Sequence, residues 1–327
     1  MSRHSTSHPI QTLLTIALLL ILNLISQVAI ADTLKVGIAQ DLVNQVELTS
    51  AYKETSWVAL MGGKDSNGVF AKDYIASEDG EEFYLAIDND HNWLKNELLI
   101  SIERLLDLNT KQRFICNYPA RSFWIQIQFP KYFADLSFKH CTELIDWSEK
   151  FINLHFSLAF ASSDYSQPAS IFGHTFLALH PSETDYLDGY AINYAANFGD
   201  QSNSLSYFFK GLTGVYPGII TASPLYKKIK EYTVENQRDI YFYHLALTSE
   251  QKKQVIFTLW ERKRAKFDYL FITENCSYAI LKILQIIEPT IEIPKGLFGQ
   301  VVPFETVKSA QEAALIDSLS VIYASSK

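Results

Sequence analysis

The chain has 327 residues, of which 48% are hydrophobic and 13% aromatic, and its formal net charge at pH 7 is −8. This composition excludes a disordered chain, because so many apolar side chains can bury a core, and the length fits one large domain or two ordinary ones. The acidic balance argues against nucleic acid as a partner, since binding phosphates requires a basic surface.

The N-terminal residues 1–31 have the features of a secretory signal peptide. Arg3 gives a weakly positive start, an apolar run follows from Leu13 to Ile25, and Ala29-Ile-Ala31 ends in a small-x-small pattern. The run is short for a membrane anchor, which needs about 20 apolar residues. We therefore predict cleavage after Ala31, export to the periplasm and a mature chain without a transmembrane segment. An uncleaved anchor helix is the alternative.

The predicted elements between residues 32 and 150 are mainly helices. Apolar residues at three- and four-residue spacings predict helices over 42–60, 92–108 and 143–151. Residues 122–129 alternate between apolar and polar, which favours a strand, although a helix is also compatible. We take 32–150 as a mainly helical N-terminal region.

From about residue 151 the pattern changes to short strands mixed with helices. Strands are predicted over 154–160, 171–180, 190–198 and 239–247. Helices are predicted over 204–212, 225–234 and 248–263, and a last apolar helix begins near Asn275. The predicted fold class is α+β with a mostly antiparallel sheet, and residues 151–327 form its second domain.

The chain contains three cysteines, Cys116, Cys141 and Cys276. In an exported protein two cysteines commonly pair, and a third is then a reactive thiol or an intermolecular link. Cys116 and Cys141 lie close together in the N-terminal region, so we expect a disulfide between them, which leaves Cys276 over. The alternative is that all three are buried reduced thiols.

Cys276 stands in the first turn of the last predicted helix. The apolar stripe of that helix continues through Ala279, Ile280, Ile283, Leu284 and Ile287. The first turn carries unpaired N–H groups and the positive end of the helix dipole, which favour a nucleophilic thiolate and can receive an oxyanion. The alternative is a small core residue that happens to open a helix.

His174 is the candidate base for this thiol. It follows Gly173 near the start of a predicted strand, and an imidazole can take a proton from a thiol and return it to a leaving group. Three further histidines, His155, His180 and His244, also lie in predicted strands. The sequence pattern alone therefore does not select His174.

Asn193 is the candidate for a third polar group that orients the imidazole. It lies on the next predicted strand, and strands adjacent in sequence commonly neighbour each other in space. Asn197 and Asp200 are rivals for this position. No ligand spacing, phosphate loop or dinucleotide fingerprint stands out, so we expect neither a metal nor another cofactor.

Several motifs resemble those of the Lnb N-terminal periplasmic domain family. They are Cys116-Asn-Tyr-Pro-Ala-Arg121, Ser170-Ile-Phe-Gly-His-Thr-Phe176, Ile192-Asn-Tyr-Ala195, Lys210 to Gly218, Glu231-Tyr232, Arg238-Asp239, Phe267-Asp-Tyr-Leu-Phe271 and Glu274-Asn-Cys-Ser-Tyr278. The resemblance implies a circularly permuted papain-like core, similar to NlpC-type hydrolases and lecithin retinol acyltransferase. In such a core the histidine strand precedes the Asn-Cys helix.

The resemblance also implies thiol-based acyl chemistry. The Lnb proteins are lipoprotein N-acyltransferases, and by that likeness Cys276 would carry an acyl thioester. Lnb joins this domain to a C-terminal bundle of membrane helices, and no such bundle is predicted in this sequence. Lipoprotein acylation is therefore only one of the chemistries that we expect.

The leading hypothesis is a periplasmic cysteine-dependent hydrolase or acyltransferase. Cys276 attacks an ester, amide or thioester carbonyl of a lipid, lipoprotein or cell-wall substrate, His174 moves the proton and Asn193 orients the imidazole. One alternative is a non-catalytic envelope module that uses the same cleft to bind lipid or peptidoglycan fragments. Another is a structural partner of an envelope protein, in which Cys276 is simply buried.

Overall fold

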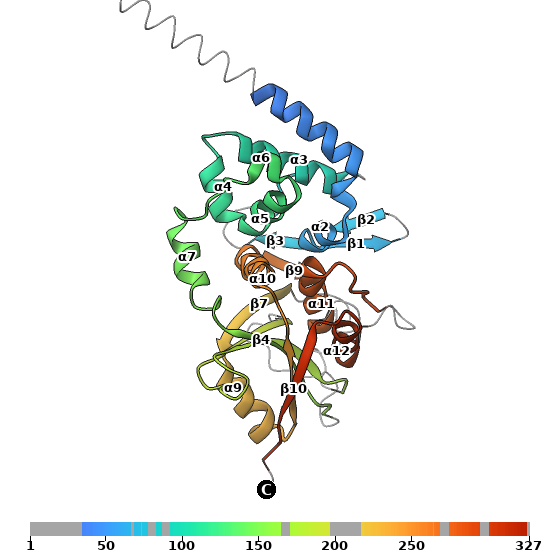
Figure 1. The fold of residues 1–327 in the computed structure, drawn as a ribbon. Coiled ribbons are helices and arrows are strands. Elements are labelled where there is room, and N and C mark those ends of the chain that lie inside the picture. The colour runs from blue at the N-terminus through green and yellow to red at the C-terminus, as the bar shows by residue number, and fades with distance from the viewer. Residues whose placement is uncertain are drawn as a thin grey trace, which may run out of the picture. The chain divides into compact units, whose positions relative to one another are not determined.

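The computed structural model describes residues 35–66, 69–72, 74–77, 83–86, 92–164, 171–196, 217–263, 265–268, 275–294 and 301–325 (Figure 1). The predicted signal peptide, the predicted helix at 204–212, and Asn197 and Asp200 lie outside these residues. The chain divides into two units, residues 1–50 and 51–327. No helix in the described ranges is long and apolar enough to cross a membrane.

The predicted helix over 42–60 is wrong in its extent. The structure has a helix over 35–49, then the 3-10 turn η1 (Ala51–Lys53) and the short helix α2 (Thr55–Leu60). The break falls at Ser50, whose φ is 53°. A residue in this left-handed conformation ends a helix, and the hydrophobic spacing of the sequence does not reveal it.

Helices dominate the part of the second unit that precedes residue 150. They are α3 (Trp93–Leu106), α4 (Lys111–Asn117), α5 (Pro119–Gln128), α6 (Pro130–Phe133) and α7 (Thr142–Ser148). The strand favoured at 122–129 is wrong, because these residues belong to α5. Pro119 starts this helix, a position that suits proline, and all residues from 119 to 125 are buried. In this helix the polar Ser122 is buried and the apolar Ile127 is 51% exposed, so the alternation of residue types does not follow the burial.

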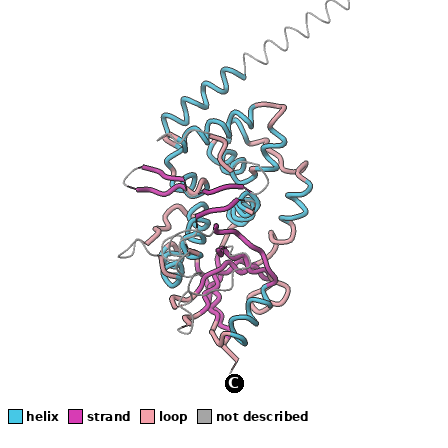
Figure 2. The backbone as a smooth tube through the Cα atoms, turned by 180° about the vertical axis from the view of Figure 1, so that it is seen from behind, coloured by secondary structure: helices cyan, strands magenta, loops and turns pink. Residues whose placement is uncertain are grey.

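An eight-stranded sheet forms the centre of the fold, with antiparallel pairing throughout its described strands. Its spatial order is β10-β8-β4-β5-β6-β7-β9-β3. Its strands are β3 (Tyr74–Ser77), β4 (His155–Ala161), β5 (His174–His180), β6 (Tyr190–Ala196), β7 (Pro217–Pro224), β8 (Ile240–Leu245), β9 (Ala265–Asp268) and β10 (Ile316–Ile322). Figure 2 shows these strands in magenta. The predicted α+β class, with an antiparallel sheet and a helical N-terminal region, is confirmed.

The remaining elements complete the second unit. A separate hairpin pairs β1 (Gly63–Ser66) with β2 (Val69–Lys72). The helices after β7 are α9 (Leu225–Lys230), the π-helical η3 (Glu231–Glu235), α10 (Ser249–Arg262), α11 (Cys276–Ile287) and α12 (Pro303–Glu312).

Strand β5 lies between helices on both faces of the sheet. Phe176 and Ala178 point to one face, where they pack in a core cluster with Leu225 of α9. Thr175 points to the other face, where its hydroxyl lies 3.1 Å from that of Ser277 in α11. The first residues of β5 therefore lie beside the first turn of α11.

The predicted disulfide between Cys116 and Cys141 is confirmed. It links α4 to the residue that precedes α7, across a sequence separation of 25 residues. By the chain-entropy argument, closing a loop of this size contributes roughly 3 kcal/mol of stability. Cys276 is the free cysteine, and its side chain is buried.

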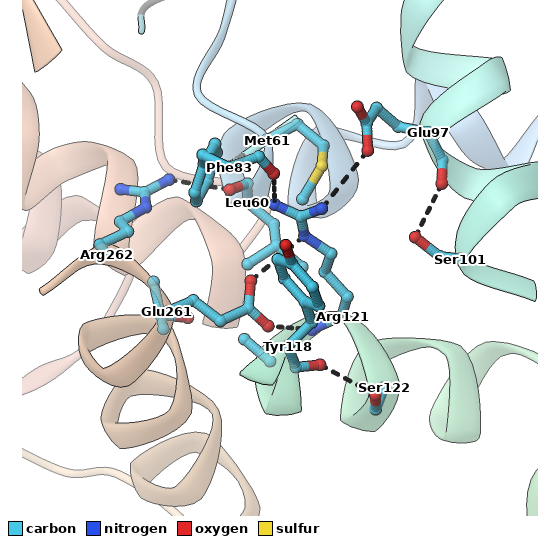
Figure 3. A network of polar contacts seen from close by, with 12 residues as sticks. Leu60, Met61, Phe83, Glu97, Ser101, Tyr118, Arg121, Ser122, Glu261 and Arg262 are labelled. Atoms are coloured by element: carbon cyan, nitrogen blue, oxygen red, sulfur yellow. Dashed lines mark hydrogen bonds and ion pairs between the residues drawn. The ribbon is translucent and has the colours of Figure 1, made fainter. Parts of the chain in front are cut away.

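A buried arginine joins the helical region to the helices around the sheet (Figure 3). The Arg121 side chain of α5 is fully buried, and its Nη1 and Nε lie 3.3 Å from Glu97 of α3 and 3.2 Å from Glu261 of α10. The Arg121 backbone N–H also donates to Glu261, and Nη2 donates to the Phe83 carbonyl. One cation thus satisfies two buried carboxylates from different parts of the chain.

Two further buried cations fix α10 against the end of α2 and α11 against the first residue of β1. Arg262 of α10 donates to the carbonyls of Ala59 and Leu60, at 2.6 and 3.0 Å. These groups lie in the last turn of α2, where the negative end of the helix dipole favours a cation. Lys282 of α11 donates to the Gly63 carbonyl at 2.7 Å. Both helices are therefore held by charged side chains at defined positions.

Replacing the buried arginine tests this account of the fold. Arg121→Met leaves the carboxylates of Glu97 and Glu261 buried without their cation. We expect the free energy of unfolding in urea to fall by about 3–5 kcal/mol. The control Lys308→Met breaks the exposed Lys308–Glu312 pair and changes that free energy by at most about 1 kcal/mol. A similar small change in both variants would contradict the account.

Candidate functional site

Cys276 is the first residue of α11, and the preceding residue caps this helix. The Asn275 side chain accepts hydrogen bonds from the N–H groups of Ser277 and Tyr278, at 3.0 and 3.3 Å, and donates to the Val301 carbonyl at 2.9 Å. Asn275 therefore satisfies two N–H groups of the first turn. The N–H of Cys276 is left to other acceptors, at the positive end of the helix.

Gly173 lets the chain enter β5 directly beside β4. Its φ is 89°, and a Cβ atom there would lie 2.7 Å from the Ala161 carbonyl oxygen and 2.6 Å from the Phe160 ring. Only glycine fits this conformation and this close approach. The next residue, His174, pairs with Ala161 in the β4–β5 register. The imidazole is thereby placed at the very start of the strand.

The Cys276 thiol and the His174 imidazole lie close enough together that each is the strongest charged influence on the pKa of the other. Burial alone would raise the pKa of the Cys276 thiol, but the adjacent imidazolium and the hydrogen bonds from His174 and Thr175 outweigh it and lower that pKa to about 6. Burial alone would lower the pKa of His174, but the thiolate raises it above 6.5. The pair therefore favours thiolate and imidazolium at neutral pH.

Asn193 lies on β6, on the same face of the sheet as His174. Its side chain is 5% exposed and contributes to the raised pKa of His174. Its Nδ2 donates to the Ala191 carbonyl at 3.4 Å, whereas its Oδ1 is buried without a partner of hydrogen-bond geometry among the described residues. The amide therefore lies close enough to the imidazole to influence its pKa.

The aromatic side chain of Tyr232 and the cationic side chain of Arg238 also lie near the imidazole. The Tyr232 ring lies 6.2 Å from the His174 ring, and the Arg238 guanidinium lies 4.9 Å from the Tyr232 ring centre. Arg238 donates to the carbonyls of Ala161 and Ser162, which fixes the end of β4 beside His174. Single-residue patterns in the sequence did not predict that Tyr232 and Arg238 lie at the site. Only the family motifs at 231–232 and 238–239 include them.

The Lnb N-terminal periplasmic domain family matches residues 143–313, which is more than half of the chain. The chain belongs to this family. A second family, a domain of unknown function designated DUF7843, matches residues 49–128. No curated protein and no solved structure matches the chain.

The match confirms the resemblance that the sequence motifs indicate, and it places this chain in a family described as periplasmic. The predicted domain boundary near residue 150 stays a prediction, as does the papain-like relationship of the Lnb N-terminal domain. In the structure, the histidine motif of this family forms the start of β5, and the Asn-Cys-Ser motif forms the start of α11.

The other strand histidines of this Lnb N-terminal domain lie away from the thiol, where a buried serine links two of them. The Ser157 hydroxyl lies 2.7 Å from Nε2 of His180 and 2.9 Å from Nδ1 of His244. His180 Nδ1 donates to the Ser182 carbonyl, and burial lowers the pKa of His180 to about 4. Burial also lowers the pKa of His244, so His180 and His244 are neutral parts of the core at pH 7. Within the described ranges, no three His, Cys, Asp or Glu side chains are arranged to hold a metal.

The coupling of the pair predicts how the thiol of this Lnb N-terminal domain titrates. His174→Ala removes the imidazolium, so the pKa of Cys276 should rise from about 6 toward its ordinary 9.0. Thiolate absorbance at 240 nm measures this directly, because the other two cysteines form the disulfide. His155→Ala, at the exposed far end of β4, should leave the midpoint unchanged. Equal midpoints in wild type and His174→Ala would contradict the pairing.

Proposed function

We propose that this protein performs thiol-based acyl chemistry in the cell envelope. It acts as a hydrolase or an acyltransferase on an ester, amide or thioester carbonyl. The observation that carries the proposal is the place of Cys276 at the start of a helix, where the thiol and the His174 imidazole shift the pKa of one another. A thiol with a lowered pKa beside a histidine is the arrangement that activates cysteine nucleophiles.

The first half of the reaction forms an acyl-enzyme. The Cys276 sulfur attacks the carbonyl carbon, and the carbonyl oxygen becomes an oxyanion that the Cys276 N–H can receive at the helix start. The intermediate then expels the leaving group, which takes a proton from the His174 imidazolium. The product is a thioester on Cys276, with His174 neutral.

The second half releases the acyl group. The neutral His174 removes a proton from water or from an acceptor amine or hydroxyl, which attacks the thioester carbonyl. The new tetrahedral intermediate expels the Cys276 thiolate, and the starting thiolate and imidazolium are restored. General acid–base catalysis of this kind contributes about 10²–10⁴-fold to the rate. In this scheme Asn193 orients the imidazole, whose pKa it helps to raise.

Exposed apolar side chains beside the histidine support a lipid, lipoprotein or cell-wall substrate. Ile171 and Phe172 immediately precede Gly173 and are 38% and 62% exposed. Large apolar side chains this exposed next to a reactive group suit an apolar ligand. The periplasmic description of the family supports an envelope substrate, and the order of histidine strand before cysteine helix supports a permuted papain-like core.

A non-catalytic role is the second candidate, and the burial of the sulfur favours it. Cys276 is only 5% exposed. In this role the site binds lipid or peptidoglycan fragments, or serves a partner protein, and the thiol is a buried core group. The two candidates differ in whether the thiol reacts with a small acyl donor.

An activated ester separates the two candidates. We expect the purified protein to release p-nitrophenol from a p-nitrophenyl ester and to gain the acyl mass on Cys276. The rate should rise with pH through a midpoint near 6, where the thiolate forms. His174→Ala should slow acylation by about 10²–10⁴-fold, and Cys276→Ala should abolish it.

Cys276→Ala and His155→Ala serve as controls for this assay. Cys276→Ala reports uncatalysed hydrolysis and any acylation of other side chains, whereas His155→Ala should acylate like wild type. Absence of adduct and of p-nitrophenol release in wild type would favour the non-catalytic role. Acylation of His174→Ala at the wild-type rate would exclude His174 as the base.

A further inference from the structure

Two buried hydroxyl groups stand beside the Cys276 sulfur. The Thr175 hydroxyl and the Ser277 hydroxyl each lie 3.9 Å from Sγ, and their oxygens are 3.1 Å apart. Both residues are 0% exposed. Hydroxyl groups removed from water in this way are costly unless they are hydrogen-bonded. The sulfur and the two oxygens therefore form a closed group of mutually contacting polar atoms.

Thr175 approaches the sulfur with its backbone as well as its side chain. Its hydroxyl donates to the Cys276 sulfur at 3.9 Å, and its backbone N–H and hydroxyl both lower the pKa of Cys276. The Ser277 hydroxyl can donate to Thr175 Oγ1, which leaves the Thr175 proton directed at the sulfur. Hydrogen bonds to an anion are shorter and about twice as strong as those to a neutral acceptor. This arrangement therefore stabilises the thiolate more than the thiol.

We propose that Thr175 is a thiolate-stabilising residue of this site and that Ser277 is the positioning residue that aligns its hydroxyl. The inference rests on the proposed function, because it assigns both residues to the same nucleophile. The Thr175 hydroxyl is a hydrogen-bond donor that carries no charge. The imidazole of His174 stabilises the thiolate by its charge only while it is protonated, whereas the Thr175 hydroxyl donates to the thiolate at any pH. His174 and the next residue, Thr175, therefore both stabilise the Cys276 thiolate.

The test measures the midpoint of thiolate formation by absorbance at 240 nm. Thr175→Val has nearly the same shape and keeps the backbone N–H but lacks the hydroxyl. We expect its midpoint to rise by about one pH unit, which is a tenfold loss of thiolate at a pH well below both midpoints. Thr175→Ser should restore the wild-type midpoint, and Ser277→Ala should give a smaller rise.

Thr258→Val is the matched control. Thr258 of α10 is also 0% exposed, and its hydroxyl donates to the Gln254 carbonyl at 2.8 Å. This variant loses a buried hydroxyl away from the sulfur, so the midpoint should not move. The charged and titratable groups that act on Cys276 and His174 from neighbouring elements are Lys228, Tyr232 and Arg238, and every variant retains them and His174.

The outcomes separate this inference from the proposed function. An unchanged midpoint in Thr175→Val, or equal shifts in Thr175→Val and Thr258→Val, would overturn the role of Thr175. If Thr175→Val does not fold, Ser277→Ala decides, and an unshifted midpoint there overturns the inference. A wild-type midpoint near 9 that His174→Ala does not change would instead reject the proposed function.

Discussion

The site depends on one packing constraint, namely that the first turn of α11 lies against the first residues of β5. Gly173 allows β5 to start beside β4, with a backbone approach that no side chain would permit. His174 and Thr175 then follow on opposite faces of the strand, and both reach the sulfur of Cys276 at the helix start. Because the strand begins at this point, the imidazole is not separated from the thiol by the sheet. The acid–base chemistry of the pair follows from this placement.

The helices that carry this constraint are held in place by buried charge. Arg262 fixes α10 to α2, Lys282 fixes α11 to the first residue of β1, and Arg121 joins α5 and α10 through Glu261. Buried ion pairs add little net stability compared with apolar packing, but breaking one is costly, so they define one arrangement of the helices strongly. The helical region before residue 150 therefore acts as a scaffold that fixes the direction of α11. We see this as the reason why the site and the helical region occur in one chain.

The sequence predicts the local features of the site well and its surroundings poorly. The apolar stripe after Cys276 is sufficient to place it at a helix start, and the spacing of Cys116 and Cys141 is sufficient to suggest their pairing. Segment 122–129 is misread because the polar Ser122 is buried there and the apolar Ile127 is exposed, so residue type does not indicate the buried face. The contacts of Arg121 with Glu261 and of Tyr232 with His174 join segments far apart in the chain, and no local pattern encodes them. Asn193 lies on the strand next to that of His174, and its role in orienting the imidazole stays a prediction.

The most direct test of the central claim observes the pair from the histidine side, by NMR titration of the His174 ring in wild type and in Cys276→Ala. In wild type the thiolate raises the pKa of His174 above 6.5, against the effect of burial. Without the thiolate, burial and the charge of Lys228 remain and both lower that pKa. The account therefore predicts a His174 pKa above 6.5 in wild type and below 6.5 in Cys276→Ala. The same His174 pKa in both proteins would show that the two groups do not interact and would contradict the account.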